Sequence, residues 1–330
     1  MTEATLSGPS ELDAVRGRTD AWRQRAARGA IWVVLLALTI ISSIVSPVFL
    51  TQRFIATLLK QAASLGIVAV GQTLAILTGG IDLSVASVMA LMSVLASHWM
   101  NGEDRLALPV SLLALAVAAT IGLANGLMVT KLKIPAFIAT LGMVLMVQGA
   151  RFVYTGGTPK GSIPEVLEFI GGGMVGPVPM AVIVWVAMVA VFVVLTRRTT
   201  FGRRLYAVGG NPRTAHLSGV NVNGVTIAAY VLCSLLAGVA GLVLTGYSGF
   251  ADNWLGRGKD LDSIAAVVVG GTLFSGGRGG VLGTVAGVLI ITIVYNLVLL
   301  LGLDEEVQRI VKGTAIILAV ALYAGLRARK

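Results

Sequence analysis

Long apolar runs dominate this chain and alternate with short polar segments. Most runs are close to the length of about 20 residues with which a helix crosses about 30 Å of hydrocarbon, and none shows the alternating ten-residue pattern of an outer-membrane barrel. The pattern predicts an all-α polytopic membrane protein with about ten transmembrane helices. The runs are residues 30–46, 62–79, 83–100, 108–130, 135–154, 179–196, 225–247, 262–275, 280–301 and 307–325.

Two places leave this count open. The stretch 79–83 interrupts the apolar sequence between the second and third runs, and the eighth run, 262–275, is short for a full crossing. Either place fits a broken or re-entrant element, which membrane proteins tolerate where the backbone lines a cavity. Counts of eight and nine therefore remain alternatives to ten.

Composition supports the membrane class. Of the 330 residues, 56% are hydrophobic and only 12% are charged, and the mean hydropathy is +0.90, which leaves too few polar groups to coat a soluble globule. The basic residues lie between apolar runs rather than on one soluble face, which argues against a nucleic-acid partner. The single cysteine, Cys233, excludes an intrachain disulfide and a cysteine metal cluster, and no metal site is predicted.

The distribution of charge sets the expected orientation. Segments assigned to the cytoplasm hold 16 of the 25 Lys and Arg residues and five of the 15 acidic residues, as the positive-inside rule requires. Both termini are then cytoplasmic, in the cytoplasmic membrane of a prokaryote. Residues 1–29 form a polar cytoplasmic tail with no clear cleavage site behind the first run, and residues 30–330 form a single transmembrane domain.

The longest basic segment between two runs, residues 197–224, is the expected contact with a soluble partner. It carries five arginines, which place it on the cytoplasmic side. Within it, the run Asn211 to Leu217 is preceded by Gly209-Gly210 and followed by Ser218-Gly219, which predicts one short helix bounded by breakers. The chain lacks a G-x-x-x-x-G-K-[ST] phosphate loop, so its energy must come from a partner or an ion gradient.

Several polar residues within the apolar runs are candidates for a translocation path. Amides and hydroxyls with almost no buried charge favour a neutral polar solute over an ion, although each alone is more often an interhelical hydrogen bond. For Asp82 and Ser84, two interpretations stay open: capping of the following helix, or a functional site at a break within the membrane. No catalytic residue is predicted. The path candidates are Gln72, Asp82, Asn125, Thr140, Gln148 and Asn296.

Three segments together resemble the permease subunits of ATP-binding-cassette sugar importers, of the ribose permease type within the branched-chain amino acid and ribose permease family. They read GQTLAILTGGIDLSVASVMAL (71–91), IPAFIATLGM (134–143), and FGRRLYAVGGNPRTAHLSGVNV (201–222) continued by LDSIAAVVVGGTLFSGGRGGVLGTVAG (261–287). The resemblance covers about residues 50 to 325. It implies a type II importer fold of about ten helices that works as a pair of permease subunits, either a homodimer or a heterodimer.

The resemblance also implies two further partners, a cytoplasmic ATPase and an extracytoplasmic sugar-binding protein. This chain itself then needs no cofactor, because ATP and magnesium bind the ATPase. The stretch GGNPRTAHLSG corresponds to the coupling helix that sits in a groove of the ATPase. Pro212 and Arg213 replace the acidic residue and alanine often found there, and proline is acceptable in a first helical turn. The coupling residues implied are Gly209, Gly210, Asn211, Ala215, Leu217, Ser218 and Gly219.

Rival functions remain open at this point. The nearest rival is a permease of the same architecture that carries a branched-chain amino acid or another small solute. A stand-alone secondary transporter or channel, and a membrane scaffold, are alternatives of other classes.

Overall fold

The computed structural model describes residues 31–304, 306–307, 310 and 313–314. The predicted tail 1–29 lies outside the described residues, as does most of the last predicted run, 307–325. The elements in chain order are the helix Ile31–Val45, the 3-10 helix η1 (Pro47–Leu50), α2 (Gln52–Leu77), α3 (Val85–Met100), α4 (Asp104–Thr130), α5 (Ala136–Thr155), α6 (Glu165–Gly172), β1 (Met174–Val175), β2 (Val178–Pro179), α7 (Met180–Arg198), α8 (Thr200–Gly210), α9 (Pro212–Leu217), α10 (Val222–Ser248), α11 (Lys259–Val269) and α12 (Val281–Leu300).

Six of these helices are long and apolar enough to cross a membrane, namely α2, α4, α5, α7, α10 and α12. The helix Ile31–Val45 and α3 are apolar but shorter, and α11 has only 11 residues. The helical polytopic class is confirmed, whereas the count of ten is not confirmed. The predicted run 262–275 is not one helix, because α11 ends at Val269 and Gly271 turns the chain with a φ of 84°, a conformation that favours glycine.

Between the predicted runs 135–154 and 179–196, where no element is expected, the structure has α6 and a small hairpin. β1 and β2 pair antiparallel, with Met174 opposite Pro179. The chain reverses between the two strands, where Gly176 has a φ of 58°. The described residues are therefore helical except for this one two-stranded hairpin and the loops.

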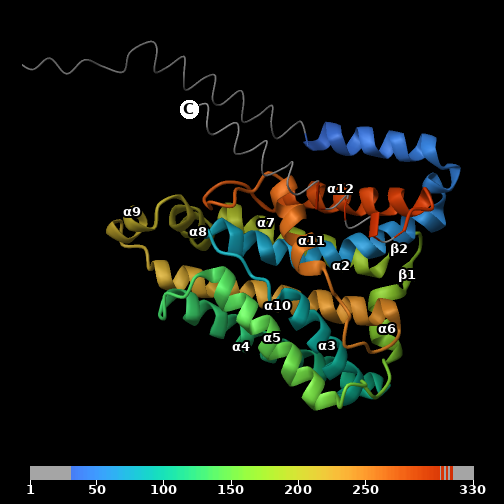
Figure 1. Ribbon diagram of the computed structural model, residues 1–330, viewed down its shortest axis with the longest axis horizontal. Helices are drawn as coiled ribbons and strands as arrows, with labels where there is room; N and C mark the ends of the chain where they lie inside the picture. The colour runs from blue at the N-terminus through green and yellow to red at the C-terminus, as the bar shows by residue number, and fades with distance from the viewer. Residues whose placement is uncertain (1–30, 305, 308–309, 311–312, 315–330) are drawn as a thin grey trace, which may run out of the picture.

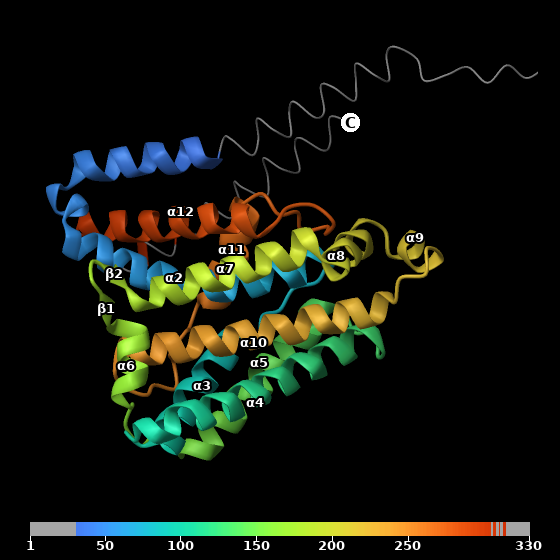
Figure 2. The ribbon, with the colours of Figure 1, turned by 180° about the vertical axis from the view of Figure 1, so that it is seen from behind.

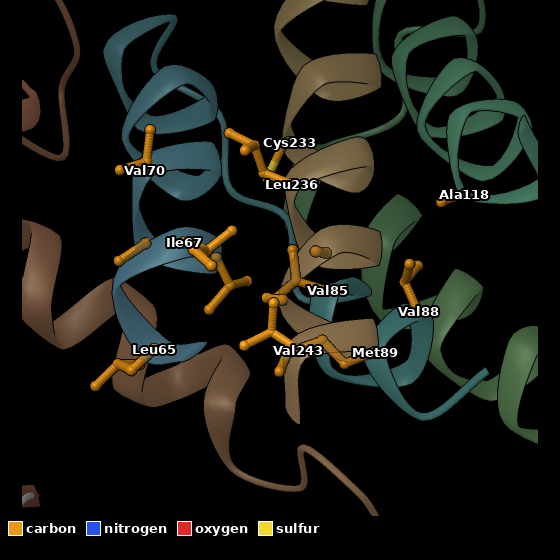
Figure 3. Packing of buried hydrophobic residues seen from close by; sticks show 14 of the residues in the cluster. Leu65, Ile67, Val70, Val85, Val88, Met89, Ala118, Cys233, Leu236 and Val243 are labelled. Carbon is orange, nitrogen blue, oxygen red and sulfur yellow. The ribbon is translucent and has the colours of Figure 1, made fainter. Parts of the chain in front are cut away.

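The centre of the molecule is made by α2 and α10. α10 packs against α2, α3, α4 and α6, and the half of α2 from Ala62 to Leu77 is buried on every side. A helix that is apolar all round requires such an interior position. Figure 3 shows side chains of this core, with Ile67 on α2, Val85 on α3 and Val243 on α10 in one region.

The outer helices leave apolar side chains uncovered. Leu112 on α4, Leu145 on α5 and Val186 on α7 are each more than half exposed. Surfaces of this kind suit contact with lipid tails, whose apolar character matches that of leucine. The exposed apolar belt therefore agrees with the membrane class.

Most of the short elements lie at the two ends of the helix bundle, whereas α11 packs against α2 and α12. In both views, α8 and α9 lie at one end, and α6 with the hairpin lies at the other (Figures 1 and 2). The predicted coupling segment 197–224 thus contains two helices rather than one. Gly209 and Gly210 do not separate a loop from a helix, because they form the last residues of α8.

We expect the close approach of α4 to α10 to depend on a glycine. A Cβ atom at Gly122 would lie 2.6 Å from the Tyr230 carbonyl oxygen and 2.8 Å from the Val231 Cα, whereas one at Gly142 on α5 would meet nothing within 4 Å. Gly122→Leu should lower the free energy of unfolding by about 1–3 kcal/mol or more, as overpacking does. Gly142→Leu is the matched control. Thermal unfolding in detergent measures both, and equal stability of the two variants would contradict the expectation.

Candidate functional site

The helical backbone is interrupted between α2 and α3, where the chain passes from an exposed glycine, Gly79, to the buried residues 82–85. α2 ends at Leu77, and Gly79 follows in the left-handed region with a φ of 83°. The Gly79 and Gly80 N–H groups donate to the carbonyl oxygens of Ile76 and Ala75, which satisfies part of the helix end as glycine C-terminal motifs do. The chain then runs without helical hydrogen bonds to Val85, where α3 begins.

Asp82 lies fully buried in this interruption. Its Oδ1 accepts hydrogen bonds from the Ser84 N–H at 2.9 Å, the Ser84 hydroxyl at 2.6 Å and the Asn125 Nδ2 at 3.4 Å. The Ser234 hydroxyl on α10 donates to its Oδ2 at 3.5 Å. Within the described residues, the one ion pair is Arg105 with Glu103, so this carboxylate is held by neutral donors.

Neither Asp82 nor Ser84 caps α3 by accepting from an N–H of its first turn. Asp82 accepts instead from the N–H of Ser84, the residue that precedes α3. The Ser84 side chain makes no cap bond to α3; it donates to Asp82 and accepts from the Asn125 Nδ2 at 2.9 Å. A side-chain oxygen that accepts from a backbone N–H two residues later is a local turn typical of aspartate before a helix. The three residues therefore tie the start of α3 to α4.

Gln72 on α2 faces the backbone of Asp82. With its amide oriented to pair both groups, the Nε2 donates to the Asp82 carbonyl oxygen at 3.1 Å and the Oε1 accepts from the Asp82 N–H at 3.3 Å. The side chain is fully buried. We call Gln72, Asp82, Ser84, Asn125 and Ser234 the Asp82 cluster; it joins α2, the interruption, α4 and α10.

Two hydroxyl groups hold the residue next to the Asp82 cluster. The Tyr230 hydroxyl donates to the Ile81 carbonyl oxygen at 3.2 Å. The Thr140 hydroxyl on α5 lies 3.4 Å from the same oxygen and donates to the Ala136 carbonyl oxygen at 2.8 Å. Thr140 thus borders the cluster without belonging to it. The polar character of Ser234 and Tyr230 in the apolar run 225–247 is the signal by which the sequence could have identified them.

The two remaining path candidates lie elsewhere. Gln148 is eight residues beyond Thr140 on α5, about 12 Å along the helix, and is only partly buried. Asn296 on α12 donates to the Gln61 Oε1 at 3.0 Å and to the Thr292 carbonyl oxygen at 2.9 Å. Gln61 is 11 residues before Gln72 on α2, about 16 Å away. Three of the six candidates, Gln72, Asp82 and Asn125, therefore come together.

At one end of the bundle, α9 is held out from the body of the protein. It packs against α8 and the start of α10, and the Asn211 Oδ1 caps it by accepting from the Thr214 N–H at 3.0 Å. The short helix predicted from Asn211 to Leu217 is confirmed: it is α9, which begins one residue later, at Pro212. Leu217, the last residue of α9, is 87% exposed.

The implied coupling residues divide by exposure. Gly209 and Ala215 are buried, and the other five are exposed: Gly210, Asn211, Leu217, Ser218 and Gly219. A groove of about 530 Å³ opens beside α9, and Pro212, Arg213, His216, Val220 and Asn223 are among its lining residues. The surface around α9 therefore combines an exposed leucine with basic side chains.

The family model described as "Branched-chain amino acid transport system / permease component" matches residues 54–320. The chain belongs to this family. Membership confirms the resemblance seen in the three segments, and it confirms that the chain is a transport component rather than an enzyme.

Curated relatives match over nearly the whole chain. The ribose import permease protein RbsC of Escherichia coli K12 is 40% identical over 325 residues, which are 97% of this chain and 98% of the relative. RbsC of Bacillus subtilis 168 is 42% identical over 293 residues, 87% and 90% of the two chains. The galactose/methyl galactoside import permease protein MglC of Escherichia coli K12 is 37% identical over 320 residues, 92% and 95%. No solved structure matches the chain.

We expect Asn125 to stabilise the interruption between α2 and α3. Asn125→Ala removes one donor from Asp82 and one from Ser84, and loss of a partner to a buried polar group costs about 1–3 kcal/mol of unfolding free energy. Gln148→Ala, at a partly exposed position, should change stability by less than about 0.5 kcal/mol. Thermal unfolding in detergent compares the two, and an unchanged melting temperature for Asn125→Ala would contradict the role of the cluster.

Proposed function

We propose that this chain is the membrane permease subunit of an ATP-binding-cassette importer for a monosaccharide, a ribose-like pentose or hexose. The observation that carries the substrate class is the near-complete match to permeases named for ribose and galactose import. The family description itself mentions branched-chain amino acids, which makes a permease for those solutes the second candidate. The relatives that match over nearly the whole chain are named for sugars, and they favour a sugar over a branched-chain amino acid as the substrate.

The finer fold in this proposal is the type II importer arrangement with ten crossings and both termini in the cytoplasm. Besides the six long helices, the helix Ile31–Val45 and α3 each make one crossing. α11 and the segment 270–280 make another together, because the Gly277 N–H reaches the Leu77 carbonyl oxygen at 3.0 Å, at the end of the bundle where α8 lies. The predicted run 307–325 supplies the tenth crossing.

The proposal gives α9 the role of coupling helix. The basic residues of the segment 197–224 favour the cytoplasmic side, and an ATPase is the soluble partner that an importer permease needs there. Burial of Leu217 in the ATPase would contribute about 1.5–3 kcal/mol, the usual value for a fully buried leucine. ATP shifts the permease between its two conformations only through a difference in binding to them.

Two further partners complete the proposed importer. A second permease subunit pairs with this one, and an extracytoplasmic binding protein delivers the sugar. The end of the bundle that carries α6 and the hairpin faces that binding protein, because α8 and α9 occupy the opposite end (Figure 1). ATP and magnesium bind in the ATPase, and this chain makes and breaks no covalent bond.

The role of α9 predicts a mutational result. Leu217→Asp places a charge where the proposed contact needs an apolar side chain, so ATP hydrolysis stimulated by the loaded binding protein should fall at least about tenfold, a loss of about 1.4 kcal/mol. Leu217→Met keeps the apolar contact and should retain stimulation. ATP hydrolysis by the complex in liposomes measures both variants. Full stimulation of Leu217→Asp would remove α9 from the ATPase contact.

The substrate class is tested by uptake. Liposomes that contain the permease and ATPase, with the binding protein outside, should accumulate ribose or galactose when ATP is inside, and should not accumulate leucine. Uptake of a branched-chain amino acid would support the second candidate. Liposomes without the ATPase are the control, and solute movement through them would indicate a stand-alone transporter instead.

A further inference from the structure

The end of α8 contacts the backbone of two other segments directly. A Cβ atom at Gly209 would lie 1.8 Å from the Leu77 carbonyl oxygen and 2.4 Å from the Gly277 nitrogen. Real Cβ atoms essentially never approach another heavy atom to less than 3.0 Å. Because both neighbouring atoms belong to backbone, no side-chain rotation can relieve the contact. Only glycine fits at this position.

Segment 270–280 meets the same place from another side. Gly276 and Gly277 have φ values of 80° and 71°, and a Cβ at Gly276 would lie 2.8 Å from the Gly79 nitrogen. The Gly277 N–H donates to the Leu77 carbonyl oxygen at 3.0 Å. We call Gly79, Gly209, Gly276 and Gly277 the glycine junction; it surrounds the end of α2.

A second bond ties α8 to this segment. The Tyr206 hydroxyl donates to the Gly279 carbonyl oxygen at 3.0 Å. The segment is also closed on itself, because the Leu273 N–H donates to the Arg278 carbonyl oxygen and the Gly280 N–H donates to the Thr272 hydroxyl. It therefore forms a compact turn that is fixed to both α8 and α2.

The glycine junction lies next to the Asp82 cluster along the chain. Gly79 is three residues before Asp82. Ile81, between them, accepts a hydrogen bond at its carbonyl oxygen from the Tyr230 hydroxyl of α10. On the other side, α8 is followed after Asn211 by α9. The junction is thus the direct backbone link between the exposed α9 and the buried interruption.

We infer that Gly209, Gly276 and Gly277 are positioning residues for transport: their backbone contacts make α8, the end of α2 and segment 270–280 move as one body, so that displacement of α9 reaches the Asp82 cluster. This inference rests on the proposed function. Packed interiors switch between discrete arrangements rather than deforming continuously. Direct backbone contact has no flexible side chain that could absorb the displacement.

The first experiment compares two glycines that are equally crowded but lie at opposite ends. Gly209→Ala disturbs the junction, and Gly171→Ala on α6, whose Cβ would lie 2.2 Å from the Tyr247 nitrogen, disturbs packing at the other end. Gly149→Ala, with nothing within 4 Å, is the neutral control. Each variant is reconstituted with the ATPase and binding protein, and sugar uptake and ATP hydrolysis are measured together.

We expect Gly209→Ala to retain the ATPase in co-purification but to transport about tenfold less sugar per ATP hydrolysed, within the usual range of coupling between sites. Gly171→Ala and Gly149→Ala should keep that ratio within about twofold. An unchanged ratio for Gly209→Ala, or an equal fall for Gly171→Ala, would overturn the inference. If the unmodified permease does not bind the ATPase, the proposed function fails instead.

A milder variant keeps the test valid if Gly209→Ala does not fold. Tyr206→Phe removes only the hydroxyl that donates to the Gly279 carbonyl oxygen, so it weakens the tie between α8 and segment 270–280 without placing a new atom against the backbone. We expect Tyr206→Phe to retain the ATPase in co-purification but to transport about fivefold less sugar per ATP hydrolysed, within the usual range of coupling between sites. An unchanged ratio for Tyr206→Phe would reject the inference.

Discussion

A non-helical backbone inside a membrane protein must find its hydrogen bonds within the protein. The interruption between α2 and α3 leaves backbone groups without helical partners, and buried polar groups of the protein supply those partners. The carbonyl oxygen of Leu77 accepts from Gly277, that of Ile81 accepts from Tyr230, and both backbone groups of Asp82 pair with Gln72. Three separate segments, 270–280, α10 and α2, therefore meet at one short stretch of chain.

This demand explains why the sequence alone leaves two interpretations of the polar residues open. Asn125 and Ser234 satisfy the Asp82 carboxylate, which in turn accepts from Ser84 to begin α3. A residue that supports an interruption and a residue that faces a transported solute are both polar, both within apolar runs and both near glycines. Sequence spacing identified Gln72, Asp82 and Asn125 but carried no information on whether they contact one another.

The sequence predicts α9 but not α8, because local residues determine the first and distant contacts determine where the second ends. α9 can be predicted from its own residues, because Asn211 is a favourable N-cap and Pro212 suits the first helical turn. Gly209 and Gly210 have the composition of a loop, yet they complete α8, because Gly209 is required for contact with Leu77 and Gly277. That cause lies in segments more than 60 residues away in either direction. α6 could have been predicted from the sequence, because Pro164 is followed by Glu165 and Glu168 in the first turn, where acidic side chains stabilise a helix.

The position of α9 limits the ways in which a force on it can enter the membrane helices. Among the elements that the structure describes, α9 packs mainly against two neighbours, α8 and α10. α8 ends at the glycine junction, next to the interruption. α10 carries Tyr230 and Ser234, 8 and 12 residues after its first residue, Val222, and these two side chains donate to Ile81 and Asp82. Both routes end at the same residues, Ile81 and Asp82, whose partners lie on α4 and α10. A displacement that broke one of these buried hydrogen bonds without replacing it would cost about 1–3 kcal/mol, so the partners must exchange together.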